Sequence, residues 1–130
     1  MKTYHQFHDG FLDGLLIDKD RGMVHVYLST WEKERNTAVL SGVLMLKAGG
    51  FREGNIILDV STRDHDEVTL KDIAELYELP SSHEPAAWEH KLIDKVREQR
   101  LQIFQVLPSY GGTCLILAQT LELVTRKNYD

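Results

Sequence analysis

The chain has 130 residues and a formal net charge of −5, with 42% hydrophobic and 27% charged residues. This length is enough to bury one hydrophobic core, and the composition is that of a globular protein rather than a disordered chain. We therefore expect a single domain spanning residues 1–130. The polar start of the chain shows no secretory signal, and no apolar run is long enough to cross a bilayer. A cytoplasmic protein that does not contact membranes is expected.

Four strand-like segments begin the chain: Phe11 to Asp18, Met23 to Trp31, Thr37 to Lys47 and Asn55 to Ser61. The second segment alternates apolar with more polar residues, which is typical of a half-buried antiparallel strand. Its apolar residues, expected on one face, are Val24, Val26 and Leu28. In the third segment Gly42 predicts a bulge or a bend, and Leu40, Leu44 and Leu46 are expected on one face.

Two helices are expected in the middle of the chain. Thr69 to Asp72 opens a short first helix, and Pro80 ends it because proline cannot donate the backbone hydrogen bond of a helix interior. The segment Ser81 to Glu84 predicts the capped start of a second helix whose first turn contains Pro85.

Two apolar strand-like segments close the chain, Leu101 to Leu107 and Thr113 to Val124. The chain order is then four strands, two helices and two strands. We therefore expect an α+β fold built on a mainly antiparallel six-stranded sheet, with both helices inserted between the fourth and fifth strands.

The negative charge is concentrated around the predicted helices. Residues 64–100 carry ten acids and five bases, which accounts for the whole net charge. Such an acidic field repels phosphate backbones and favours a basic protein partner, although a solvated helix face would show the same pattern. The aromatic side chain at the end of the second strand is a further candidate for recognition. The predicted binding residues are Asp64, Asp66, Glu67, Asp72, Glu75, Glu78 and Trp31.

The N-terminal segment contains a cluster of potential metal ligands, His5, His8, Asp9 and Asp13, of which His5, His8 and Asp9 are the predicted metal site. Imidazole and carboxylate groups are the usual ligands of divalent metals, and these residues are close enough in sequence to converge. A complete site would also need a ligand from another element, such as His25 or His65. The alternative interpretation is that His8 and Asp9 fix the turn before the first strand.

Two other functional classes are excluded by the sequence. Thr69 to Leu76 is similar to the first helix of a DNA-binding helix-turn-helix motif, but Glu78 stands where the turn needs glycine. The second helix of such a motif would contain Pro80 and Pro85 and no basic residue, and the local charge opposes nucleic-acid binding. Cys114 lies among apolar residues, so we expect a buried thiol and no nucleophilic catalysis. No cofactor is predicted.

Several short segments carry a family resemblance. Phe7-His8-Asp9-Gly10 precedes the first strand, and Pro108-Ser109-Tyr110-Gly111 precedes the last one. With the strands Leu40 to Leu46 and Asn55 to Val60, this order resembles a group of small bacterial domains that includes immunity proteins of contact-dependent or polymorphic toxin systems. The resemblance implies a non-enzymatic protein that binds and neutralises a toxin.

Three hypotheses follow. The first is a non-catalytic binding domain of the immunity type, which contacts a basic protein partner through the acidic helical surface. The second is a small metal-dependent hydrolase that uses His5, His8 and Asp9. The third is a structural module that self-associates, for example as a homodimer, through an uncovered edge strand.

Overall fold

The computed structural model describes residues 1–80 and 82–126 of the chain. Within these residues it contains seven β-strands, two α-helices and one short 3-10 helix, η1. No helix in this part of the chain is long and apolar enough to cross a membrane. The bounds are β1 Lys2–Thr3, η1 His5–Phe7, β2 Phe11–Asp18, β3 Met23–Ser29, β4 Arg35–Gly49, β5 Ile56–Arg63, α1 Leu70–Leu76, α2 Ala87–Gln99, β6 Gln102–Tyr110 and β7 Thr113–Arg126.

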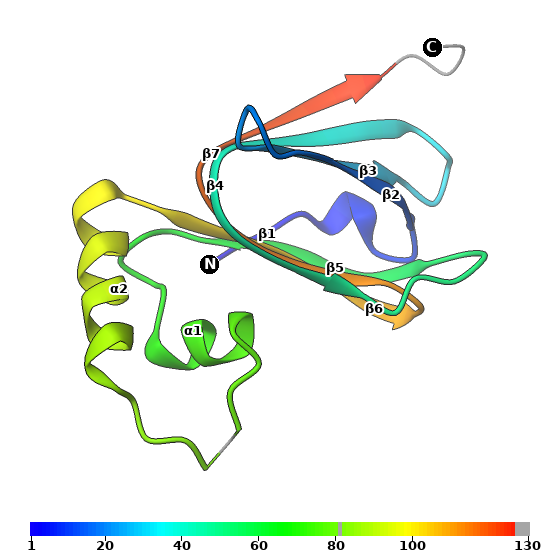
Figure 1. Cartoon of the computed structure of the whole chain (residues 1–130). Helices are drawn as coiled ribbons and strands as arrows, with labels where there is room; N and C mark the ends of the chain where they lie inside the picture. The colour runs from blue at the N-terminus through cyan, green and yellow to red at the C-terminus, as the bar shows by residue number, and fades with distance from the viewer. Residues whose placement is uncertain (81, 127–130) are drawn as a thin grey trace.

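The strands form one antiparallel sheet in the order β1-β5-β2-β3-β4-β7-β6, which confirms a mainly antiparallel α+β architecture. A further pairing of β5 with β6 and one residue pair between β2 and β5, Phe11 with Ile56, close the sheet on itself. Figure 1 shows the result as two layers, with β2 and β3 in one and β5 and β6 in the other. The 3-10 helix lies between the layers, and both α-helices lie outside the second layer.

The two longest strands, β4 and β7, run through both layers because both bend. As far as Ser41, β4 pairs with β3 and with the second half of β7; beyond it, β4 leaves β3 and pairs with the first half of β7. Gly42 lies at this corner with a φ of +61°, and a Cβ there would lie 2.4 Å from Gln119 Oε1. The register then shifts between Val43 and Met45. The bend predicted at Gly42 is therefore confirmed.

The bulge after the bend changes which side chains of β4 face the interior. Leu40 is fully buried, but Leu44, predicted on the same face, is 40% exposed. The extra residue in the bulge breaks the period of two, so the alternation before Gly42 does not continue through it. The prediction that Leu44 shares the face of Leu40 is wrong for this reason.

The interior between the layers is filled by apolar side chains. The buried face predicted for β3 is confirmed, and Phe7 of η1 is fully buried in the same core. The first core therefore includes a side chain from outside the long strands. Its buried members are Phe7, Leu12, Val24, Val26, Leu28, Ala38, Leu40, Ile57, Val60, Phe104, Val106, Cys114, Ile116 and Ala118.

A second core lies between the two helices and the outer face of the second layer. Phe104 and Ile116 point into the interior, whereas Ile103 and Leu117 belong to the helix-covered core. Because β6 and β7 are covered on both faces here, their sequences are nearly continuous apolar runs. The buried members of this second core are Val68, Ile73, Leu76, Val96, Leu101, Ile103, Leu115 and Leu117.

Three details of the predicted fold are wrong. The described sheet has seven strands rather than six, because two-residue β1, which pairs with β5, is too short to show an alternating pattern. The second helix begins at Ala87 rather than near Ser81, which lies outside the described residues; Pro85 disfavours a helical residue before it. The first helix ends at Leu76, a turn early, and the chain leaves it through Glu78 at a φ of +55°.

Cys114 lies in the first core and is fully buried. Burial disfavours the charged thiolate and raises the pKa of this thiol to about 12. The side chain is therefore a protonated, small apolar group at neutral pH, which agrees with the sequence-based expectation.

We predict that Gly42→Ala destabilises the protein by about 1 to 3 kcal/mol, because alanine would be strained at a positive φ and would clash with the Gln119 side chain. The matched control is Gly49→Ala in the same strand, where an added Cβ meets no heavy atom within 4 Å. Urea unfolding measures both free energies. Equal stability of the two variants would contradict the role assigned to Gly42.

Candidate functional site

The structure places the predicted acidic residues in different environments. Asp64, Asp66 and Glu67 lie together in the connection between β5 and α1, with one carboxylate oxygen of each within 4.8 Å of the others. Glu67 Oε2 accepts a hydrogen bond from the Met1 amino group, and Glu67 Oε1 accepts one from the Asp64 amide at 3.0 Å. Part of this cluster therefore has a structural role in holding the N-terminus against the loop.

Asp72, also predicted to bind, is used by the fold. Its carboxylate lies 3.1 Å from Arg63 Nη2, in a pair that is mostly shielded from solvent. It also accepts the Thr69 amide, while the Thr69 side chain accepts the Asp72 amide, which caps the start of α1. These contacts attach α1 to β5, so Asp72 has little capacity left for a partner.

Glu75 and Glu78 lie on the rim of a groove between α1 and the segment that leads to α2, which we call the insert groove. The Lys47 ammonium contacts the Glu75 carbonyl oxygen at 3.3 Å and lies 3.9 Å from the Glu78 carboxylate. Both glutamates are nevertheless exposed. The groove has a volume of about 640 Å³. Its apolar walls are formed by Leu70, Ala74, Leu79, Pro80 and Pro85.

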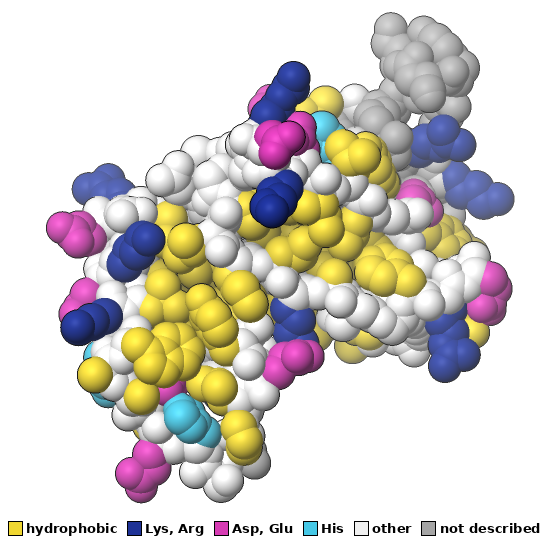
Figure 2. Space-filling view, viewed as in Figure 1, with side chains coloured by type: hydrophobic (Ala, Val, Ile, Leu, Met, Phe, Trp, Pro, Cys, Tyr) yellow, Lys and Arg dark blue, Asp and Glu magenta, His cyan; other side chains and the backbone are white. Residues whose placement is uncertain are grey.

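An aromatic pair extends the apolar surface of the helical region. Tyr77 and Trp88 meet edge to face with ring centroids 5.0 Å apart, yet they remain 38% and 43% exposed. Figure 2 shows hydrophobic side chains gathered over α1 and α2, with charged side chains around them. An exposed apolar patch with a charged rim is the usual appearance of a protein-binding surface.

One wall of the insert groove contains a buried carboxylate. The Glu89 side chain is only 1% exposed; it accepts hydrogen bonds from the Ala86 amide at 2.9 Å and from His83 Nε2. The Ala86 hydrogen bond is the main reason that the pKa of Glu89 is lowered, and His83 adds to this while burial opposes it. Through these contacts Glu89 holds the 83–86 segment against the start of α2 and shapes the groove.

The predicted metal ligands are only partly brought together. His8 Nε2 lies 3.6 Å from the Asp9 carboxylate, and His8 Nδ1 contacts the Leu58 carbonyl oxygen at 2.8 Å. Asp9 takes a left-handed φ of +61°, and its amide donates to the Ile57 carbonyl. In the described part of the chain, His5 forms no group of three ligand atoms with these two residues. The contacts resemble a fixed turn before β2 more than a metal site.

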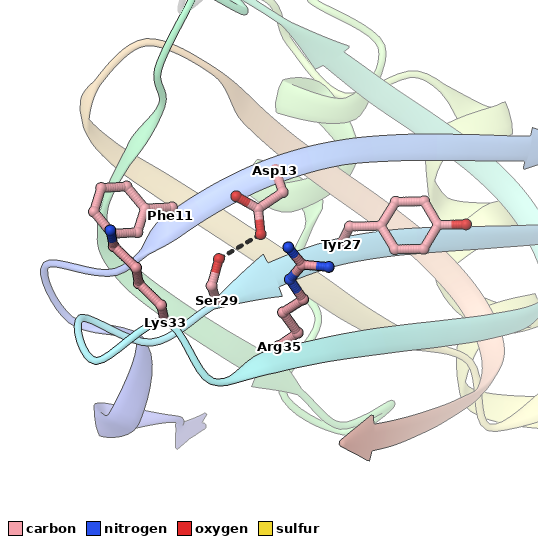
Figure 3. A pocket seen from close by; sticks show the side chains of 6 residues that line it. All are labelled: Phe11, Asp13, Tyr27, Ser29, Lys33 and Arg35. Atoms are coloured by element: carbon pink, nitrogen blue, oxygen red, sulfur yellow. Dashed lines mark hydrogen bonds between the residues drawn. The ribbon is translucent and has the colours of Figure 1, made fainter. Parts of the chain in front are cut away.

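A second concave site, which the sequence did not indicate, lies on the outer face of β2, β3 and β4 (Figure 3). We call it the strand cleft; its volume is about 630 Å³. A register shift between Leu12 and Gly14 makes Asp13 a bulge residue, and its carboxylate accepts a hydrogen bond from the Ser29 hydroxyl. The cleft is lined by Phe11, Asp13, Tyr27, Ser29, Lys33 and Arg35.

Trp31, the remaining predicted binding residue, lies beside the strand cleft rather than on the acidic surface. Its ring stacks on Phe11 with centroids 6.4 Å apart and planes inclined by 21°, and it is still 69% exposed. The signal that could have led to the cleft is the hairpin register. Pairing of Phe11 with Ser29 and of Ser29 with Arg35 brings these residues to one place, although the bulge at Asp13 hides that register.

Comparison of the chain with protein-family models, with curated proteins and with solved structures finds no match. Two surfaces of the chain have the features of a binding site: the insert groove with its aromatic pair, and the strand cleft.

We predict that Glu89→Gln lowers the melting temperature at pH 7, because the amide replaces a carboxylate held by two hydrogen bonds. Because the pKa of Glu89 is lower in the folded state, its carboxylate stabilises the fold at pH values above the unfolded pKa. This stabilisation is lost as the pH falls through the folded pKa. The difference from the unmodified protein should therefore shrink below about pH 4. Thermal unfolding followed between pH 3 and pH 7 measures it.

Glu98→Gln is the control, because Glu98 is exposed on the same helix. A melting-temperature difference for Glu89→Gln that stays constant over the whole pH range would contradict the assignment.

Proposed function

We propose that the chain is a non-catalytic binding domain of the immunity type, which captures a basic protein partner through the helical insert between β5 and β6. The observation that carries the proposal is the exposed aromatic pair, Tyr77 and Trp88, close to an apolar groove with a carboxylate rim. Large aromatic side chains at the centre of an interface commonly supply most of the binding energy.

The electrostatic part of the proposal depends on Glu75 and Glu78. Both are exposed on the groove rim. Lys47 forms a long ion pair with Glu78 at 3.9 Å and contacts only the backbone oxygen of Glu75. They lie in the segment that carries the excess negative charge of the chain. A basic partner would be attracted to this rim, which raises the association rate and makes it sensitive to salt.

The groove is held by ordered contacts on several sides, which favours binding. The Arg63–Asp72 pair attaches α1 to the sheet, and Glu89 holds the opposite segment through His83 and Ala86. A surface that is already formed loses less conformational entropy when a partner binds. A toxin with a basic surface is the partner that the resemblance to immunity proteins implies.

A second candidate function, self-association through a sheet edge, is favoured by one observation. After Ala118, β7 pairs with β4 on one side, and no described strand pairs with its other side. An unpaired edge of this kind can template pairing with another copy. Analytical ultracentrifugation distinguishes the candidates, because self-association gives a concentration-dependent dimer without any partner.

If a gene for a basic toxin lies beside this chain's gene, we predict that its product binds the chain with an affinity that falls as salt rises. Glu75→Lys combined with Glu78→Lys should weaken this binding by roughly tenfold or more and reduce its salt dependence. Trp88→Ala should cost about 2 kcal/mol of binding free energy, the size typical of a central aromatic side chain. Isothermal titration calorimetry at low and high salt measures all three.

The matched control is Asp94→Lys combined with Glu98→Lys, which makes the same charge change at exposed positions of α2 outside the insert groove. If this control weakens binding as much as the rim variant does, the charge effect is not local to the groove. Absence of binding by the basic product of such a neighbouring toxin gene would contradict the immunity-type proposal itself.

A further inference from the structure

The strand cleft combines three features that ordinary sheet surfaces avoid. The bulge residue Asp13 lines it, Lys33 lines it from a left-handed backbone conformation, and its two cations outnumber its one carboxylate. Bulges and strained backbone cost stability, and both are concentrated at binding sites, where they aim side chains. All three features occur in one cleft on the first layer, away from the helical insert (Figures 1 and 3).

The turn between β3 and β4 is held in a fixed shape. The Thr30 amide donates to the Glu34 carbonyl at 3.0 Å, and the Lys33 amide donates to the Thr30 carbonyl at 2.8 Å. The Thr30 hydroxyl oxygen also accepts the Glu34 amide at 3.1 Å. Within this turn Lys33 has a left-handed φ of +69°, which is uncommon for a residue other than glycine, and its side chain lines the cleft.

The two cations of the cleft are free to bind. Within residues 1–80 and 82–126, neither Lys33 nor Arg35 forms a side-chain hydrogen bond or an ion pair. Both are exposed, and neither forms an ion pair with Asp13, the one acid that lines the cleft. The cleft therefore has an excess of one positive charge in a protein whose net charge is −5.

The centre of the cleft supplies acceptors beside these donors. The Ser29 hydroxyl donates its hydrogen bond to Asp13. Lone pairs on the Ser29 oxygen and on the second Asp13 oxygen therefore remain available to accept hydrogen bonds. Figure 3 shows this pair lying between Phe11 and Tyr27, with Lys33 and Arg35 approaching from the β3–β4 side. Ser29 itself is buried, so its oxygen has a fixed position.

We propose that the strand cleft binds a small molecule that carries an oxyanion, a carboxylate or a phosphate, next to a hydroxyl or amino group. Arg35 and Lys33 bind the oxyanion, since a guanidinium presents paired donors that match the oxygens of either group. Asp13 and Ser29 accept the hydrogen bond of the neighbouring hydroxyl or amino group. The Phe11 ring, stacked under Trp31, forms the apolar wall.

The size and charge of the cleft favour a small ligand over a nucleic acid. A volume of about 630 Å³ is in the range of ordinary small-molecule sites. A polyanion would meet the repulsion of a chain with a net charge of −5, whereas a single phosphate or carboxylate meets mainly the local positive charge. This inference does not depend on the proposed function of the helical insert.

The test uses the ¹⁵N-labelled full chain and four probes: inorganic phosphate, glycerol 3-phosphate, L-malate and uncharged glycerol. Glycerol 3-phosphate and L-malate should shift the amide resonances of residues 11–13, 27–29 and 33–35 saturably, and glycerol should not. Arg35→Gln should weaken the binding of glycerol 3-phosphate and of L-malate by roughly tenfold, the effect of losing a charge-assisted hydrogen bond. Arg21→Gln, which removes an exposed arginine at the other end of the hairpin, should leave both affinities unchanged.

Asp13→Asn separates the two halves of the site. Losing the carboxylate removes repulsion, so inorganic phosphate should bind more tightly, whereas glycerol 3-phosphate loses an acceptor for its hydroxyl. The affinity ratio of glycerol 3-phosphate to inorganic phosphate should therefore fall. An unchanged ratio would overturn the acceptor role of Asp13. Absence of saturable shifts with any charged probe, or equal losses in the Arg35 and Arg21 variants, would overturn the site.

Discussion

The pairing of β4 with β7 through their common bend is the constraint on which the rest of the structure depends. These strands are the only described ones that run through both layers, and they join the β2–β3 hairpin to β5 and β6. The bend favours Gly42, because its positive φ strains other residues and an added Cβ would displace the Gln119 side chain. Without this corner the first core would lose one of its two walls.

The corner also places both candidate surfaces. One layer carries the strand cleft on its outer face, and the other layer carries the helices on its outer face. Because β6 and β7 are covered on both faces, the helical insert is attached to the sheet by a core of its own. The two candidate surfaces therefore share no lining residue, so each can be tested by substitution without altering the other.

Sequence patterns predicted the elements well and the side-chain environments less well. Alternation found the buried face of β3, and Gly42 revealed the bend, because both are local signals. Asp72 was predicted to bind because composition reports charge and not partners, and its pair with Arg63 joins distant elements. The strand cleft was missed since it depends on the hairpin register and on the bulge at Asp13, neither of which is visible in residue spacing.

Native-state hydrogen exchange tests the central role of the β4–β7 pairing most directly. If the fold depends on it, the slowest-exchanging amides lie in residues 35–49 and 113–125 on both sides of the bend, and they exchange only on global unfolding. The β2–β3 hairpin tip and α1 should exchange earlier through local opening. If the β4–β7 amides instead exchange before those of β5 and β6, the two layers are stable independently, and the bend does not hold the structure together.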